Sequence, residues 1–414
     1  MEEKYNLRTN DNNYNKDDKL KRKELAEKYV KFITSLDSHH VIALDSPWGT
    51  GKSTFINYMC EKLKVNNSVF VSYNAWENDY TKEPLISLMN DIFHQFKDKK
   101  YIGIDKMKSS MNKISFIAKK GGSAILKGGA KLFLGENGTN DIEDALKEAA
   151  KVFIEDVSDD IFKDVEDSKK SRQQFKEELK KYTKKILEEK NKDKLIILID
   201  ELDRCKPSFA IELLENIKHL FDIENIIFFI AVDNKQLAES IKSIYGNGFD
   251  ANTYLHRFFD IELHLPKNNI NEYFITQLDK KVYQDTYDEI KNKNEFTVDA
   301  IKAFNLSIRD IDRICNEIFL LSKLFHIKEP NIYLVLLILK YKNYSNYNYI
   351  KENVHEFISS KIAIYFKDST YTKNFFYNHV KKYCFTKDKK TGPNNSSVIN
   401  KETIEAFRRI EETL

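Results

Sequence analysis

Two short segments, far apart in the chain, carry residue types that bind phosphate and activate water in proteins. The first is SPWGTGKST at residues 46–54. In a loop of this kind the backbone N–H groups curl around a phosphate, a lysine such as Lys52 adds positive charge, and a hydroxyl such as Ser53 faces Mg²⁺. The segment therefore predicts a nucleotide-binding loop. Its expected contact residues are Trp48, Gly49, Thr50, Gly51, Lys52, Ser53 and Thr54.

The loop departs from the usual G-x-x-x-x-G-K-[ST] pattern at its first position, which is Ser46. Gly49 and Gly51 still supply backbone freedom close to the phosphate. The first position mainly shapes the entry of the chain from the preceding strand. We therefore expect the small Ser46 to replace the glycine without loss of the loop.

The second segment, LIILIDELDRC at residues 195–205, places two carboxylates at the end of an apolar run. Asp200 is expected to hold the hydration shell of the magnesium ion. Glu201 is expected to orient and deprotonate the attacking water. The next charged residues, Asp203 and Arg204, have two interpretations: they form a structural ion pair, or they couple the site to a neighbour.

Five apolar runs of the length of buried strands position these residues. Each is separated from the next by enough residues for a helical crossover, which predicts an α/β fold with a five-stranded parallel sheet in a three-layer sandwich. Periodic helices are expected at Ser53–Lys64 and Lys235–Ile244. The runs are Val41–Asp45, Val69–Tyr73, Leu195–Asp200, Ile226–Val232 and Ile261–Leu265.

Several ordered motifs resemble those of the KAP family of P-loop NTPases. Besides the two segments above they are YNAWEND from Tyr73, FFIAVD followed by YLHRFFDIELHLP, and LSIRDIDRI from Leu306. The resemblance spans roughly residues 22 to 325. It implies an ASCE-type P-loop NTPase core in which the Ile226 strand lies between the phosphate-loop strand and the acidic strand. Asp233 would then be a sensor of the γ-phosphate, or simply the N-cap of the helix that follows it.

The resemblance also gives two arginines alternative roles. Arg257 stands where related oligomeric NTPases send a finger into a neighbouring subunit's site, and it is otherwise a surface arginine. Arg309 resembles a lid residue that reaches back to the nucleotide. If both contact nucleotide, hydrolysis depends on lid closure and on a partner subunit.

Composition and length suggest a multidomain globular protein. The chain has 414 residues and a net charge of +3. Its four cysteines are widely spaced, which argues against a disulfide framework or a zinc site and fits a reducing cytoplasm. No targeting segment is expected. The predicted organisation is a disordered N-terminus (1–20), an NTPase core in two parts (21–84 and 191–270), a helical insertion (85–190), a helical lid (271–328) and a C-terminal helical domain (329–414).

Within the insertion, residues 106–137 are rich in lysine and glycine, with a short repeat, KGGSAIL then KGGAKLF. Its apolar runs are too short to span a membrane. The segment could lie on an anionic membrane surface, or form a glycine-rich hairpin that packs on protein. The C-terminal region alternates aromatic residues with lysine, which suits the core of a small helical domain or stacking on single-stranded nucleic acid.

Together these features predict an ATPase that uses Mg²⁺. ATP is favoured over GTP because DNKQL at residues 233–237 lacks the aspartate of a guanine-reading motif. The resemblance implies a homo-oligomer or a partner protein, and an association with phage exclusion. Two alternatives remain: a nucleotide-dependent scaffold in which turnover is incidental, and a motor acting on nucleic acid.

Overall fold

The computed structural model describes most of the two predicted core parts and of the lid. The described residues are 18–81, 83–96, 105–112, 114, 159–281, 293–325, 327, 330–345 and 347–348, with short stretches at 385–387, 397–399, 403–404, 406 and 409–410. The N-terminus up to residue 17, most of the basic segment 106–137 and most of the C-terminal region lie outside this set.

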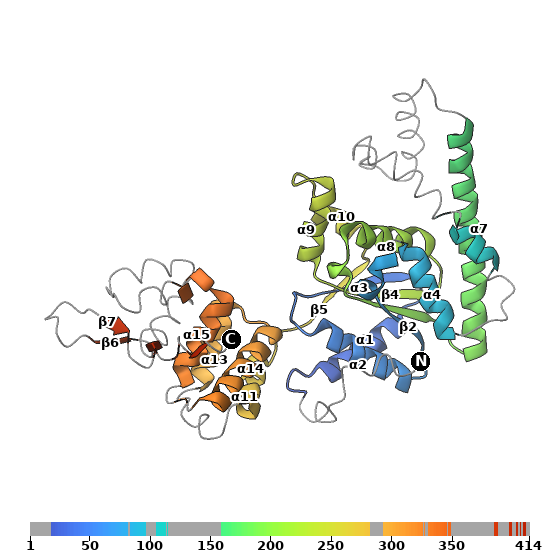
Figure 1. Ribbon diagram of the computed structural model, residues 1–414. Helices are drawn as coiled ribbons and strands as arrows, with labels where there is room; N and C mark the ends of the chain where they lie inside the picture. The colour runs from blue at the N-terminus through green and yellow to red at the C-terminus, as the bar shows by residue number, and fades with distance from the viewer. Residues whose placement is uncertain are drawn as a thin grey trace. The chain divides into compact units, whose positions relative to one another are not determined.

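The described chain forms two compact units (Figure 1). The core unit comprises Lys23–Pro47 and Lys52–Leu265, and the C-terminal unit comprises the chain from Pro266 onward together with Trp48–Gly51 and the residues up to Arg22. The tip of the phosphate loop is thus grouped with the C-terminal unit.

A five-stranded sheet in the order β2-β3-β4-β1-β5 forms the centre of the core unit. All of its strand pairs are parallel, which confirms the predicted α/β fold and the placement of β4 between β1 and β3. The strands lie within one residue of the predicted runs at either end: β1 (His40–Asp45), β2 (Val69–Asn74), β3 (Leu195–Asp200), β4 (Ile226–Val232) and β5 (Ile261–His264).

Helices cover both faces of the sheet because successive strand residues point to opposite sides. In β3, Ile197 belongs to the hydrophobic cluster that includes residues of α4, α7, α8, α9 and α10, whereas Ile196 and Leu198 belong to the cluster that includes residues of α1 and α2. The sheet is therefore the middle layer of a three-layer sandwich (Figure 1). The helices are α1 (Arg22–Ser35), α2 (Lys52–Val65), α3 (Ala75–Asn78), α4 (Pro84–Phe96), α7 (Asp159–Lys190), α8 (Pro207–Leu220), α9 (Asn234–Tyr245) and α10 (Ala251–His256), with 3-10 turns η1 (Asp79–Thr81) and η3 (Leu202–Arg204).

The C-terminal unit is built mainly from helices around a separate core. Its helix α15 is buried from Pro330 to Leu339 and is therefore a core helix of this unit. The unit also contains a short antiparallel pair of strands that the sequence did not predict. The elements are α11 (Ile270–Lys281), α13 (Lys293–Phe304), α14 (Ile308–Leu324), α15 (Pro330–Lys342), β6 (Phe385–Lys387) and β7 (Ser397–Ile399).

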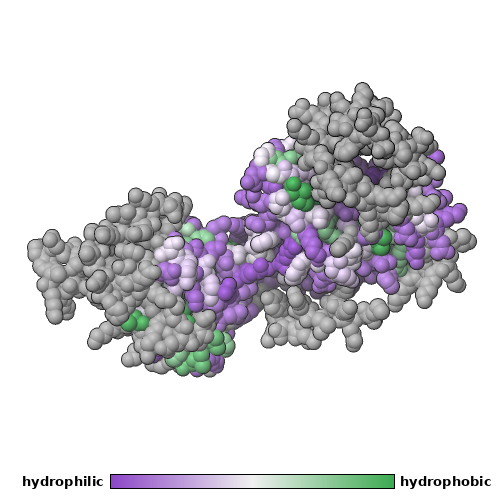
Figure 2. All heavy atoms as spheres, turned by 45° about the horizontal axis from the view of Figure 1, so that its top comes forward, coloured by the Kyte–Doolittle hydropathy of each residue, from purple (hydrophilic) through white to green (hydrophobic). Residues whose placement is uncertain are grey.

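The described surface is largely hydrophilic on the face drawn in Figure 2, with hydrophobic residues in small clusters. In the part of the chain that the structure describes, none of the helices combines the length and the apolar content needed to cross a bilayer.

Candidate functional site

The phosphate loop follows β1, and its glycines adopt the conformation that the motif requires. Gly49 has φ of 80° and Gly51 has φ of 86°, values at which a side chain would be strained. Ser46 has no such φ, so glycine is not needed there. The buried Ser46 instead uses its hydroxyl, which donates to the Asp45 carbonyl at 2.6 Å and accepts from Leu265 N at 2.9 Å. The serine thus anchors the loop entry to β1 and to the end of β5.

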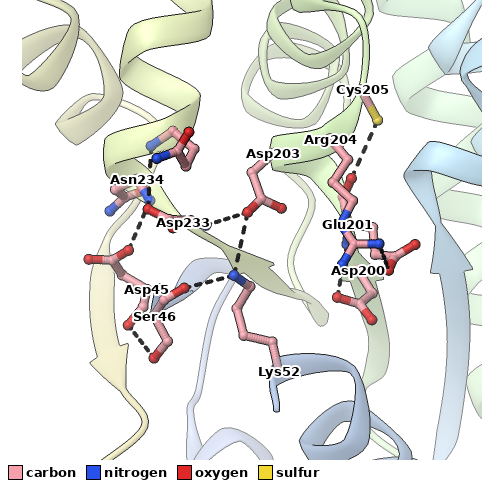
Figure 3. A network of polar contacts seen from close by, with 11 residues as sticks. Asp45, Ser46, Lys52, Asp200, Glu201, Asp203, Arg204, Cys205, Asp233 and Asn234 are labelled. Carbon is pink, nitrogen blue, oxygen red and sulfur yellow. Dashed lines mark hydrogen bonds and ion pairs between the residues drawn. The ribbon is translucent and has the colours of Figure 1, made fainter. Parts of the chain in front are cut away.

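Lys52, the first residue of α2, extends its ammonium group to two acceptors in the core unit (Figure 3). The Nζ atom lies 2.7 Å from the Ser46 carbonyl oxygen and 3.4 Å from Asp203 Oδ2. The Lys52 side chain is 9% exposed and that of Asp203 is 1% exposed. The lysine charge is therefore held inside the loop by a buried ion pair.

Ser53 and Asp200, the two residues expected to serve the metal, are close enough for the Ser53 side chain to lower the pKa of Asp200. Burial raises the pKa of Asp200 to about 6, against this opposing effect of Ser53, and its Oδ1 accepts from Glu201 N at 2.8 Å. One hydroxyl and one carboxylate are hard oxygen donors of the kind Mg²⁺ takes together with phosphate and water. No group of three or more acidic, histidine or cysteine side chains among the described residues could hold a metal by itself. The donor set fits a magnesium ion bound with a nucleotide, and does not fit an all-protein metal cage.

Two carboxylates fix the tip of β4 next to the loop. Asp203 Oδ2 accepts from Asp233 N at 3.1 Å, and Asp45 Oδ1 accepts from Asn234 N at 2.9 Å. The side chain of Asp233 accepts from Gln236 N at 3.3 Å and caps α9, which is the predicted N-cap role. Asp203 consequently touches both the loop lysine and the candidate sensor residue.

Glu201 directly follows β3 and has φ of 61°, in the left-handed region that is rare for residues other than glycine. Its carboxylate pairs with Arg204, and Asn74 donates to it. Asp203 and Arg204 thus take different partners, Lys52 and Glu201. The sequence predicts no role for Asn74, although this residue lies in the motif YNAWEND. The register of the sheet pairs Asn74 with Asp200.

The remaining predicted residues are placed as follows. Arg257 is exposed at the end of α10, ahead of β5, and its carbonyl accepts from Lys218 Nζ. Arg257 lies toward the amino end of β5, whereas Lys52 and Asp200 lie at the carboxyl ends of β1 and β3. Arg257 is therefore not next to the site formed by its own chain.

Arg309 is the second residue of α14, and its backbone N donates to the Gly49 carbonyl at 3.1 Å within the C-terminal unit. A Cβ atom added at Gly49 would come within 2.7 Å of Ser307 Oγ. Of the other loop residues, Thr50 is buried, Thr54 is exposed and Trp48 is 45% exposed.

Comparisons with known proteins agree with this geometry at the level of the family. No curated protein matches the chain. Two substituted forms of Thermotoga maritima RuvB are similar at 11% identity, covering 94% of this chain and 93% of theirs, with TM-scores of 0.31 and 0.32. A DNA replication initiation factor is similar at 12% identity over 94% of this chain and 86% of its own, with a TM-score of 0.25. The KAP family P-loop domain matches residues 22–325, which include the loop, both carboxylates and α14, and the chain therefore belongs to this family of P-loop NTPases.

Proposed function

We propose that the chain binds ATP with Mg²⁺ at the carboxyl ends of β1, β3 and β4 and hydrolyses it to switch its conformation or assembly. One observation carries the proposal. The loop residues lie beside the end of the acidic strand: Lys52 Nζ is 3.4 Å from Asp203 Oδ2, in the turn that follows β3, and the Ser53 side chain lowers the pKa of Asp200. This is the pairing that a P-loop and an acidic strand make around a nucleotide.

In this proposal the loop amides and Lys52 hold the phosphate charge. Ser53 and Asp200 would hold Mg²⁺, which supplies positive charge that neutralises the phosphate oxygens. The positive φ values of Gly49 and Gly51 support the role of the loop, because they turn successive N–H groups toward one concave side. Asp200 must lose its proton to serve as a ligand, and the Ser53 side chain and the hydrogen bond from Glu201 N favour that form.

Glu201 is proposed to orient the attacking water and accept its proton, because it directly follows Asp200 at the end of β3. Asp233 is proposed to act with it from the tip of β4, since its backbone is tied to Asp203. Arg309 is proposed to contact the nucleotide from the start of α14, beside Gly49.

Calorimetric ATP titration and steady-state turnover test these roles. Lys52→Ala should abolish ATP binding, whereas Lys64→Ala, an exposed lysine on the same helix, should bind as the wild type does. Glu201→Gln should retain binding and lose about 10²-fold to 10⁴-fold in kcat. Equal ATP binding by the two lysine variants, or none by the wild type, would remove the proposal.

We further propose that the active form is a homo-oligomer in which Arg257 reaches the site of a neighbouring subunit. The exposure of Arg257 at the end of α10 supports this. If it is right, Arg257→Ala and Glu201→Gln are each inactive alone, and mixing them restores part of the activity, because some sites combine a native arginine with a native glutamate. A mixture as inactive as its components would exclude the arrangement.

On the basis of the family resemblance, we propose a biological role in defence against phage. Cells expressing the chain should reduce phage plating, and cells expressing Glu201→Gln should not. Full protection by Glu201→Gln would instead identify a scaffold in which nucleotide binding suffices. Wild-type cells that plate phage as the empty host does would exclude the role.

A further inference from the structure

The carboxylate of Glu201 is engaged at both oxygens. Arg204 Nη1 lies 2.6 Å from Oε1, and Asn74 Nδ2 donates to Oε2 at 3.3 Å. The Arg204 contact joins opposite charges and is the shorter of the two, whereas Asn74 is a neutral donor at longer range. Arg204 therefore makes the stronger of the two contacts with the Glu201 carboxylate.

Arg204 also contacts an aromatic ring. Its guanidinium carbon lies 5.6 Å from the centre of the Trp76 ring. Arginine is attracted to the face of tryptophan at this range, by about 0.5–1 kcal/mol at exposed sites. Trp76 is 49% exposed and belongs to α3, the short helix that Asn74 caps. Trp76 and Asn74 thus come from one segment, and they act on Arg204 and on Glu201 respectively.

The backbone of this segment restricts Glu201 further. The Glu201 carbonyl accepts from Arg204 N at 3.2 Å and from Cys205 Sγ at 3.6 Å, which closes the turn η3 on itself. The left-handed conformation of Glu201 costs about 1–3 kcal/mol and persists because the surrounding contacts enforce it. The side chain is only 13% exposed. Position and direction of the carboxylate are therefore both fixed by its neighbours.

A general base needs a free carboxylate oxygen within hydrogen-bonding reach of a water molecule. Each donor that a carboxylate oxygen accepts from leaves fewer of its lone pairs for a water molecule, and here one oxygen accepts from a guanidinium and the other from an amide. We infer that Arg204 is a positioning residue that withholds the Glu201 carboxylate from the attacking water, and that Trp76 keeps Arg204 in place. The inference rests on the proposed ATPase function of the same site.

Steady-state kinetics of the full chain test the inference. Arg204→Ala should raise kcat by roughly tenfold, the size expected when a charge-assisted hydrogen bond to the base is released, and leave KM within about twofold. Arg204→Lys should raise kcat less, because lysine keeps the charge and loses the flat group that stacks on the ring. Trp76→Leu should raise kcat by about two- to fivefold, and Trp76→Phe should stay closer to the wild type.

Lys206→Ala is the matched control. Lys206 lies two residues beyond Arg204, is exposed, and pairs with Asp79 at 3.7 Å instead of with Glu201. This variant should have the kcat and KM of the wild type. An unchanged or lower kcat in Arg204→Ala, or an equal rise in Lys206→Ala, overturns the inference.

Measuring the same substitution in the Glu201→Gln variant separates an effect of Arg204 that acts through Glu201 from a general effect on the fold. In Glu201→Gln, adding Arg204→Ala should leave the residual kcat unchanged, and a rise equal to that in the native background overturns the inference. ATP binding is measured in parallel by calorimetry. If the variants bind ATP normally and kcat does not rise in Arg204→Ala, this inference alone is overturned. If the wild-type chain binds no ATP, the proposed function and the inference are both overturned.

Discussion

Glu201 combines a carboxylate needed for the proposed chemistry with a backbone that suits glycine better. Its φ of 61° places the Cβ atom where it is strained against the backbone. Strain of this kind is found at functional positions, where the side chain is needed in spite of its cost. Glycine should therefore be more stabilising than alanine at this position, which is the reverse of their order inside an ordinary helix.

We predict that Glu201→Gly is more stable to denaturant than Glu201→Ala by about 1 kcal/mol, because both lose the carboxylate and only alanine keeps the strained Cβ. Glu177, exposed within α7, is the control position: there the alanine variant should be the more stable, by about 1 kcal/mol. Urea unfolding of the four variants measures both differences. The same order at both positions would contradict a strained Glu201.

Asp200 should make the stability of the chain depend on pH in an unusual direction. Its pKa is raised to about 6, mainly because burial removes water from the charged form. The folded state therefore binds the proton more tightly than the unfolded state does. The favourable contribution of this group is present below its unfolded pKa and is lost as the pH rises through about 6.

We predict that Asp200→Asn, without Mg²⁺ or nucleotide, gains stability over the wild type as the pH rises from 4 to 7, by at most about 3 kcal/mol at roughly 1.4 kcal/mol per pKa unit. Asp250 gives the opposite control, because the Thr253 hydroxyl donates to it at 2.6 Å and lowers its pKa. Asp250→Asn should lose stability above about pH 4 and approach the wild type as the pH falls. Thermal melts across this range report both, and a difference for Asp200→Asn that is constant with pH would refute the assignment.

At the scale of elements, the tips of neighbouring strands are tied together by buried acceptors. Asp203, in the turn after β3, accepts from Lys52 at the start of α2 and from Asp233 N at the end of β4. A buried carboxylate is tolerated only when its partners replace the lost water. Asp203 therefore joins the loop helix to the strand between β1 and β3.

We predict that Asp203→Ala lowers the free energy of unfolding by about 3–5 kcal/mol, since it leaves the buried Lys52 ammonium without its counter-charge. Asp203→Asn should cost less, because the amide oxygen can still accept from Asp233 N. Asp222→Ala removes a 67% exposed carboxylate that lies 3.6 Å from Lys176 and should cost less than about 1 kcal/mol. Denaturant unfolding compares the variants, and equal losses for Asp203→Ala and Asp222→Ala would be inconsistent with a buried link.

At the scale of the whole molecule, the two units have separate hydrophobic cores. The core unit buries apolar residues on both faces of its sheet, and the C-terminal unit buries a different set around α14 and α15. Units with their own cores are expected to unfold as separate cooperative steps. Leu213 in α8 and Leu336 in α15 are fully buried members of the two cores.

We predict that calorimetry resolves two melting transitions and that each core substitution lowers a different one. Leu213→Ala should lower the transition of the core unit, and Leu336→Ala that of the C-terminal unit, each by about 2–5 kcal/mol in stability. A single transition that both substitutions lower equally would show that the two units unfold together.

The sequence by itself determined the strands, the loop and the family. Apolar runs such as Leu195–Asp200 could be placed almost to the residue because burial on both faces of a parallel sheet leaves a continuous local signal. The loop could be read because its glycines, lysine and hydroxyl act within a single turn of chain. The position of β4 between β1 and β3 followed from the family resemblance, and the sheet has this arrangement.

Only the tertiary structure decided which charged groups pair. Asp203 and Arg204 are neighbours in sequence with two open interpretations, and the fold sends one to Lys52 and the other to Glu201. Asn74 reaches Glu201, 127 positions further along the chain, because β2 lies beside β3 in register. A buried charge takes the partner that the packing places within reach, and that choice depends on the three-dimensional arrangement of strands that no local pattern encodes.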